Sequence, residues 1–188
     1  MTTTYYTLMD SPIGELLAVG DGTALTRLHM QGGRTRSSID PRWERDDGRF
    51  ADVRAQLDEY FAGERHEFSL PLAPAGGAFE SRVWNELLKI PYGATASYGE
   101  IAARTGAPGA ARAVGLANGR NPIAVIVPCH RVIGADGSLT GYGGGLERKR
   151  LLLDLEAGVT PLAAAVGDQE RRVDYVSVPD DPAPVAVA

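Results

Sequence analysis

The amino-acid sequence predicts a mixed α/β (α+β) protein, in which an antiparallel sheet with a helix precedes a mainly helical unit. Residues 4–30 alternate apolar and polar side chains in short runs, which is typical of antiparallel strands. Residues 79–119 instead place apolar side chains at helical spacing. Between these patterns, residues 70–78 (LPLAPAGGA) have the composition of a linker. We therefore expect an N-terminal α/β domain at 1–75 and a C-terminal domain at 76–165.

In the first domain, the turn-forming segments DSPIGE and GDGT divide residues 4–30 into the strands of an antiparallel meander. The stretch 31–48 is polar and rich in turn formers, so we expect an exposed loop. The segment FADVRAQLDEYFAGE then has the apolar spacing of a helix, with Gly63 as its stop signal. The apolar positions of this helix are Val53, Leu57, Tyr60 and Phe61.

The second domain is expected to contain a helix-turn-helix. A first helix is predicted by the apolar face of Phe79, Val83, Trp84, Leu87 and Leu88. Ser97 and Glu100 form a capping box that starts a second helix, which runs to about Arg104. The segment TGAPG breaks that helix, and AARAVGLAN begins another. Two helices joined by a tight turn are typical of this motif, although most such pairs only pack a core.

The last of these helices carries small side chains and one long cation. Ala110, Ala111, Ala113 and Gly115 keep its surface thin, so that another backbone or a groove wall can approach closely. Arg112 is the long cationic side chain on that face. This pattern is compatible with a nucleic-acid partner or with an ordinary solvated surface.

Composition excludes several other classes of protein. A single cysteine rules out an internal disulfide and a structural zinc site with several cysteine ligands. The three histidines, His29, His66 and His130, are scattered. The N-terminal segment does not have the pattern of a signal peptide, and no apolar run approaches the roughly 20 residues of a membrane helix. We therefore expect a cytoplasmic protein without a membrane partner.

The formal net charge is −5, but the charge is unevenly distributed. Residues 76–165 carry nine Lys and Arg against seven Asp and Glu, whereas the flanking segments are acidic. A polyanion site should therefore lie in this middle segment and depend only modestly on charge. Residues 166–188 are acidic and rich in proline, so we expect a disordered tail there.

Cys129 is followed directly by His130. A reactive cysteine needs a base or a positive field, and histidine is a suitable base. Adjacent side chains of a regular strand point to opposite faces. The two side chains can therefore cooperate only if the chain turns at Pro128 and Cys129, or if a water links them. A carboxylate would orient the histidine, and both Asp154 and Glu156 of GLERKRLLLDLEAG are candidates.

The motif PCHRVIG, preceded by NPIAVIV and followed by GYGGGLERKRLLLDLE, resembles the methylated-DNA–protein-cysteine methyltransferases of bacterial type. These are the direct-repair proteins for 6-O-alkylguanine. The resemblance spans about residues 76–158 and includes FESRVWNELLKIPYG, ASYGEIA and AARAVGLAN. The N-terminal part resembles the variable domain of the family only in length and strand content. The resemblance implies a ribonuclease-H-like first domain and a winged helix-turn-helix in the second.

Carried onto this sequence, the resemblance implies that Cys129 accepts the alkyl group. His130 would act through water as the base that keeps Cys129 a thiolate, and Glu156 would orient His130. Asn121 would be the hinge that ties the recognition helix to the active-site strand.

For binding DNA, the resemblance implies that Tyr98 presses on the phosphate beside the lesion. Arg112 would replace the extruded guanine in the base stack, and the helix surface around Ala111 and Gly115 would face the groove. The remaining residues implied to form the base pocket are Tyr142, Gly143, Gly144 and the backbone of Val132. Some members of the family have serine where this chain has Gly143, so a hydroxyl contact would be lost.

The implied function is direct DNA repair by irreversible, single-turnover transfer of a methyl or other alkyl group to Cys129. The substrates would be 6-O-alkylguanine and 4-O-alkylthymine in duplex DNA, approached by a monomer from the minor groove. No cofactor or metal is implied, because the cysteine and histidine ligands of the metal-binding form are absent. The alternatives are a Cys–His hydrolase and a non-catalytic lesion-binding protein. The lack of a second cysteine disfavours a transcription activator that is switched by methylation.

Overall fold

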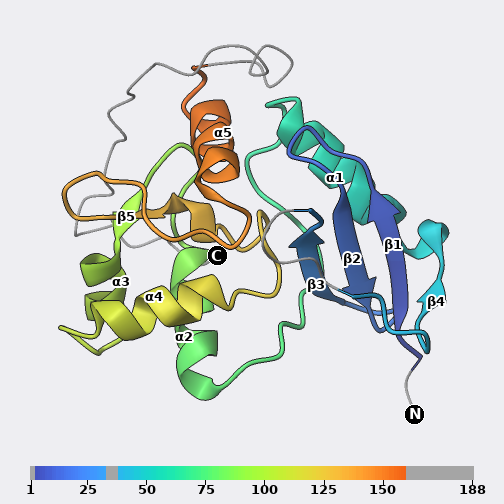
Figure 1. The fold of residues 1–188 in the computed structure, drawn as a ribbon, viewed down its shortest axis with the longest axis horizontal. Helices are drawn as coiled ribbons and strands as arrows, with labels where there is room; N and C mark the ends of the chain where they lie inside the picture. Colours follow the sequence, from blue (N-terminus) through green and yellow to red (C-terminus); the bar gives the residue numbers. More distant parts are fainter. Residues whose placement is uncertain (1–2, 33–37, 160–188) are drawn as a thin grey trace, which may run out of the picture.

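The computed structural model of the protein describes residues 3–32 and 38–159. The chain forms a sheet with one helix from its N-terminal half and a group of helices from its C-terminal half, side by side (Figure 1). This arrangement confirms the predicted mixed α/β class. The tail predicted at 166–188 lies outside the described residues, and the domain boundaries at 75 and 165 stay predictions.

The sheet consists of the predicted meander with one additional strand. Strands β1 (Tyr5–Met9), β2 (Leu16–Gly20) and β3 (Leu25–Met30) pair in antiparallel fashion, in the order β3-β2-β1-β4. Strand β4 (Glu44–Arg45) pairs in parallel with β1, so the expectation of an exposed loop throughout 31–48 is wrong at its end. Strand β4 has only two residues, both exposed, and therefore has no hydrophobic pattern that could reveal it.

Helix α1 (Ala51–Phe61) follows a short 3-10 helix, η1 (Asp47–Phe50), and lies next to the sheet with one end near α5 (Figure 1). Gly63 follows the helix with φ +76, which confirms it as the stop signal. All four of the predicted apolar positions are buried, namely Val53, Leu57, Tyr60 and Phe61.

The C-terminal half contains the predicted helices. Helix α2 (Ala78–Leu87) precedes α3 (Tyr98–Arg104) and α4 (Ala111–Gly119). The Ser97–Glu100 capping box is present at the start of α3, because the Ser97 hydroxyl accepts from the Glu100 N–H and Glu100 accepts from the Ser97 N–H. Trp84 of α2 donates its indole N–H to the carbonyl oxygen of Ala117 at 2.9 Å and so holds α4 against α2.

Two further elements complete this half. Strands β5 (Ala96–Ser97) and β6 (Val132–Ile133) form a two-stranded parallel sheet. Helix α5 (Leu146–Glu156) is the last element, and three described residues follow it. The winged form of the helix-turn-helix stays a prediction. Among the described residues, every helix is too short or too polar to cross a lipid bilayer.

The two halves share one core, and strand β3 joins them. The Leu28 N–H donates to the Pro122 carbonyl at 2.8 Å, and Leu28 accepts from the Ala124 N–H at 3.0 Å. The same strand also pairs with the predicted linker, since the Leu25 N–H donates to the Pro71 carbonyl at 2.8 Å. The β3 edge of the sheet is thus covered by the linker and by the segment that leads to Cys129.

Candidate active site

Cys129 lies at a turn in the chain and not in a strand. It begins the 3-10 helix η2 (Cys129–Arg131), directly after Pro128, and it is 5% exposed. Strand β6 begins only at Val132, so Cys129 precedes this strand, and the role of Asn121 as a hinge stays a prediction. The turn allows Cys129 and His130 to avoid the opposite-face geometry of a regular strand.

His130 is fully buried and is oriented by Glu156 at the end of α5. The Nε2 atom of His130 lies 2.7 Å from Oε1 of Glu156. Because an ionised carboxylate only accepts hydrogen bonds, Nε2 carries the hydrogen and Nδ1 is free to accept one. Nδ1 is buried and has no hydrogen-bond partner within residues 3–32 and 38–159. Of the two acidic candidates in the sequence, Glu156 is thus the partner of His130.

The Glu156 carboxylate is held by several donors. Arg131 donates from Nε to Oε2 at 2.8 Å and from Nη2 to Oε1 at 3.0 Å. The Tyr60 hydroxyl donates to Oε1 at 2.7 Å. Burial alone would raise the pKa of Glu156, but His130 and Arg131 outweigh it and hold this pKa well below its usual range. Glu156 is therefore an anion that fixes the His130 ring.

Burial acts on both the Cys129 thiol and the His130 ring, and it favours the neutral form of each. Burial raises the pKa of the Cys129 thiol, against the opposing effects of Asn121, Lys149 and Tyr142. Burial also lowers the pKa of His130, although Glu156 acts in the opposite direction. Desolvation thus opposes a thiolate at Cys129 before substrate binds, and the role of His130 as the base that forms the thiolate through water stays a prediction.

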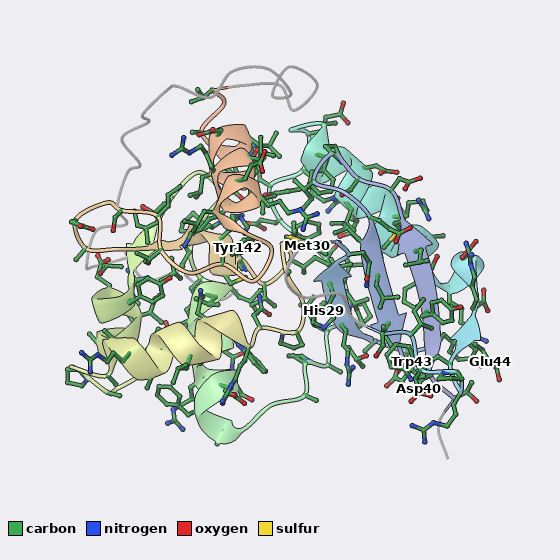
Figure 2. All side chains as sticks on the ribbon, viewed as in Figure 1. His29, Met30, Asp40, Trp43, Glu44 and Tyr142 are labelled. Carbon is green, nitrogen blue, oxygen red and sulfur yellow. The ribbon has the colours of Figure 1, made fainter. Side chains whose placement is uncertain are left out.

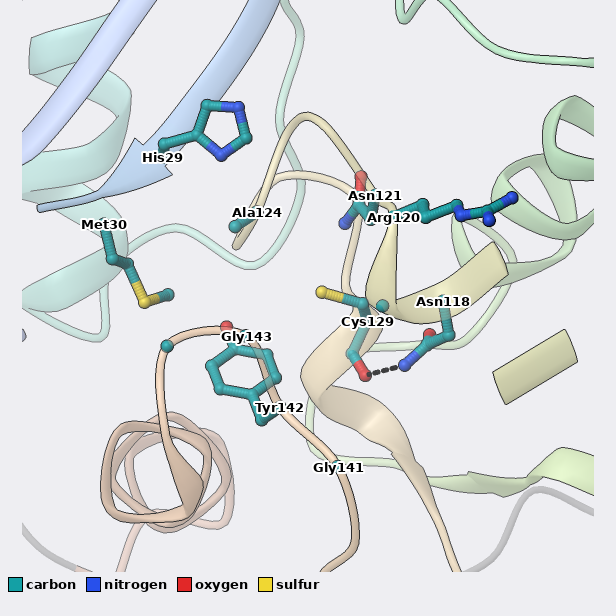
Figure 3. A pocket seen from close by; sticks show the side chains of 12 residues that line it. His29, Met30, Asn118, Arg120, Asn121, Ala124, Cys129, Gly141, Tyr142 and Gly143 are labelled. Atoms are coloured by element: carbon teal, nitrogen blue, oxygen red, sulfur yellow. Dashed lines mark hydrogen bonds between the residues drawn. The ribbon is translucent and has the colours of Figure 1, made fainter. Parts of the chain in front are cut away.

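Two asparagines hold the backbone around Cys129. Asn121 donates from Nδ2 to the Val127 carbonyl at 2.7 Å and accepts from the Ile123 N–H at 3.0 Å. These bonds close a loop in which Val125 has φ +72, a strained value for a β-branched residue. Asn118, which the sequence did not reveal, donates from Nδ2 to the Cys129 carbonyl at 3.2 Å (Figure 3).

Lys149 is a second residue of the site that sequence reasoning missed. It lies on α5, is fully buried, and donates from Nζ to the carbonyls of Val132 (2.6 Å) and Thr140 (2.8 Å). Burial lowers its pKa to about 8. In the sequence it stands between Arg148 and Arg150, and nothing in that basic run distinguishes the buried lysine from the two arginines.

A cavity of about 250 Å³ opens beside Cys129. Its walls come from both halves of the chain, since His29 and Met30 at the end of β3 face Cys129 and Tyr142 across it (Figures 2 and 3). The Tyr142 hydroxyl is buried and interacts with the Cys129 thiol. The other lining residues are Asn118, Gly119, Arg120, Asn121, Ala124, Gly141, Gly143 and Gly144.

Three predicted pocket residues, Tyr142, Gly143 and Gly144, thus line the cavity. A Cβ on Gly144 would meet the Met30 sulfur, so a larger residue there would require the Met30 side chain to shift. Val132 does not line the cavity formed by the described residues, and its carbonyl accepts from Lys149. Its predicted contact with a guanine edge stays a prediction.

The predicted DNA-contacting residues lie together on α3 and α4. Arg112 is exposed in the first turn of α4, and no ion-pair partner for it is present among residues 3–32 and 38–159. A Cβ on Gly115 would lie 3.8 Å from the Tyr98 ring, so a small residue there admits this ring. The Tyr98 hydroxyl donates to the Thr140 carbonyl at 3.3 Å and connects α3 to the loop before Tyr142.

Comparison with known proteins gives matches over both halves. Residues 4–74 match the family model "6-O-methylguanine DNA methyltransferase, ribonuclease-like domain", and residues 78–158 match the model of the DNA binding domain. A methylated-DNA–protein-cysteine methyltransferase of Mycobacterium leprae is 60% identical over 148 residues, which cover 79% of this chain and 89% of the relative. Its Mycobacterium tuberculosis counterpart is 57% identical over 157 residues, which cover 84% and 94%.

A solved structure agrees with these sequence matches. The crystal structure of Mycobacterium tuberculosis OGT in complex with DNA has a TM-score of 0.79 and 56% identity to this chain. The match covers 86% of this chain and 97% of that structure. Together with the buried cysteine, histidine and glutamate described above, these matches show that the chain belongs to the methylated-DNA–protein-cysteine methyltransferases, enzymes of direct DNA repair that transfer an alkyl group to a cysteine.

Proposed function

We propose that Cys129 accepts the alkyl group from 6-O-alkylguanine in duplex DNA, in an irreversible reaction that each molecule performs once. The observation that carries this proposal is the placement of the sole cysteine beside a cavity of about 250 Å³, backed by His130 and Glu156. A cavity of this size suits one flat base with a small alkyl group, because pockets for larger ligands usually exceed about 300 Å³. The same pocket is proposed to accept 4-O-alkylthymine.

In the proposed reaction the Cys129 thiol loses its proton through a water molecule to Nδ1 of His130. The sulfur attacks the alkyl carbon, an S–C bond forms and the C–O6 bond breaks. The electron pair of that bond stays on the guanine oxygen, and the proton removed from the thiol returns to the guanine. Glu156 stabilises the imidazolium during transfer and keeps the Nε2–H tautomer. The thioether product makes the reaction irreversible.

The lesion oxygen lies inside the duplex, so the nucleotide must leave the base stack before it can reach the cavity. We propose that α4 enters the minor groove, where its alanine and glycine residues permit close approach, and that Arg112 fills the vacated stack. Tyr98 is proposed to contact the phosphate beside the lesion. The small positive balance of residues 76–165 suits an encounter that depends only mildly on salt. The protein is proposed to act as a monomer without a cofactor.

Intact-mass analysis after mixing the protein with a 6-O-methylguanine duplex tests this function. We expect a gain of one methyl group per molecule, mapped to Cys129 by peptide sequencing. Cys129→Ser and Cys129→Ala should take up no methyl group yet still bind the lesion duplex. Product formation well beyond one equivalent per protein would indicate a turnover enzyme such as a hydrolase. Binding without any transfer by the wild type would indicate a non-catalytic lesion-binding protein.

A further inference from the structure

The N-terminal half supplies one hydrogen bond to the Glu156 carboxylate. Tyr60, the tenth residue of α1, is fully buried, and its hydroxyl donates to Oε1 of Glu156 at 2.7 Å. That oxygen is the same atom that holds Nε2 of His130, also at 2.7 Å. Tyr60 and Glu156 are 96 residues apart in the sequence. Their hydrogen bond lies where one end of α1 approaches α5 (Figure 1).

Packing of the ring does not require the hydroxyl. The Tyr60 ring contacts the rings of Phe61, Phe68 and Tyr92 with centroids 5.3, 5.4 and 6.0 Å away. A phenylalanine would fill this aromatic cluster equally well. The hydroxyl adds a charge-assisted hydrogen bond to a buried anion, a stronger interaction than a bond between neutral groups. Burial and the nearby carboxylate raise the pKa of Tyr60 well above its usual value, so the hydroxyl stays protonated and remains a donor.

The bond from Tyr60 competes with the bond from His130. Each hydrogen bond donated to Oε1 offsets part of the negative charge on this oxygen, and that charge would otherwise stabilise a protonated imidazole. Removing the Tyr60 hydroxyl therefore leaves more of that charge for His130 and raises the pKa of the ring. The two bonds from Arg131 remain, so the carboxylate keeps its place without Tyr60.

Other charged or titratable groups also surround the His130 ring and Tyr60. Arg131 and Lys149 both disfavour a protonated ring at His130. Tyr92 donates to the Leu155 carbonyl, at 3.4 Å, and not to the carboxylate. His66 stacks on the far side of the aromatic cluster, against Tyr92 at 4.1 Å.

We propose that Tyr60 is a positioning residue of the alkyl-transfer site, through which the N-terminal half of the chain adjusts the strength of His130 as a base. This inference rests on the proposed function of Cys129 and His130. The N-terminal half would then contribute to the reaction through Tyr60, in addition to lining the cavity with His29 and Met30.

The test compares Tyr60→Phe with Tyr92→Phe, a matched control that removes a neighbouring hydroxyl without touching Glu156. Single-turnover transfer from a 6-O-methylguanine duplex is measured from pH 5 to 9 in the full chain. We expect the acid limb of the Tyr60→Phe profile to move up by about half to one pH unit. This is less than one hydrogen bond to a charged group can supply, because Arg131 still binds the carboxylate. Tyr92→Phe should keep the wild-type profile.

Titration of the His130 ring nitrogens by NMR, without DNA, provides a readout that does not need activity. The midpoint should rise in Tyr60→Phe by the same amount as the kinetic limb. If Tyr60→Phe does not fold, site-specific 3-fluorotyrosine at position 60 keeps the shape and makes a stronger donor, and the midpoint should fall. An unchanged midpoint in whichever folded variant is measured overturns the inference. Failure of the wild type to take up methyl on Cys129 overturns instead the proposed function, and the NMR titration still decides whether Tyr60 controls His130.

Discussion

The side-chain amide of Asn118 donates to the carbonyl oxygen of Cys129 at 3.2 Å, so the last turn of α4 is bonded directly to the residue proposed to accept the alkyl group. Both residues are buried, and Trp84 holds the same turn of α4 through its bond to the Ala117 carbonyl. The helix proposed to enter the groove and the reactive residue therefore form one rigid unit. Displacement of α4 would move the Cys129 backbone with it.

Asn118→Ala should lower the free energy of unfolding by about 1–3 kcal/mol, because the Cys129 carbonyl loses a buried partner. We also expect slower alkyl transfer at saturating DNA, since the position of Cys129 is less well fixed. Urea denaturation and single-turnover kinetics measure the two effects. Leu116→Ala, at an exposed position of the same helix, is the control and should stay within about 0.5 kcal/mol of the wild type. Equal stability of the two variants would contradict a role for the Asn118 bond.

Arg112→Ala should slow repair of duplex DNA by about 100-fold, because the vacated base stack has no replacement and flipping costs a few kcal/mol. Reaction with the free base 6-O-methylguanine should change little, since no stack has to be opened. Arg150→Ala, at an exposed position of α5 that does not line the described cavity, is the control and should leave both rates unchanged. Equal losses on the duplex and the free base would mean that Arg112 supports the fold or the cavity instead.

Glu156→Gln should reduce stability at neutral pH by about 3–5 kcal/mol, since Arg131 is left as a buried, uncompensated charge. The folded-state pKa of Glu156 is depressed, so its contribution is present above the ordinary value of 4.5 and is lost as the pH falls below it. The variant should therefore lose less stability than the wild type between pH 5 and 3. Urea midpoints across this range measure the difference.

The double change Arg131→Met with Glu156→Gln is the control for that experiment. It removes both charges, so much of the neutral-pH loss should be recovered while the shallow acid dependence remains. An acid dependence of Glu156→Gln as steep as that of the wild type would show that other carboxyls govern acid unfolding.

Met30→Ala should widen the cavity from the N-terminal side, opposite Cys129. We expect the ratio of the rates with 6-O-benzylguanine and 6-O-methylguanine to rise by about tenfold, which is typical of discrimination by apolar pocket contacts. Competition assays with the two free bases measure this ratio. Met9→Ala removes a buried methionine of β1 that does not line the described cavity, and it should leave the ratio unchanged. A similar rise in both variants would point to general loosening of the core.

Local signals in the sequence predicted local structure well. The Ser97–Glu100 capping box and the Gly63 stop signal depend on residues within a few positions of one another, and both are present. The two-residue strand β4 depends on pairing with distant β1, and the sequence contains no sign of it.

In the site, too, local relationships were predicted and long-range ones were not. Spacing identified Cys129 and His130 as a pair but left Asp154 and Glu156 equivalent, because only packing decides which of them points inward. The family resemblance selected Glu156. Tyr60 was correctly placed on a buried face, yet a partner 96 residues away is invisible to spacing. Asn118 was likewise hidden, since an asparagine near the end of a helix is ordinarily solvated or caps the chain locally.

The bond between Trp84 and Ala117 also gives the protein an internal optical probe. The chain has two tryptophans, of which Trp84 is buried between α2 and α4 and Trp43 lies in the N-terminal half, with Arg27 5.7 Å from its ring. The emission of a buried indole shifts to longer wavelength when water reaches it. With Trp43 replaced by phenylalanine, the remaining tryptophan emission would come from Trp84 alone. Its wavelength would report in real time whether α4 stays packed against α2 while the protein binds DNA and reacts.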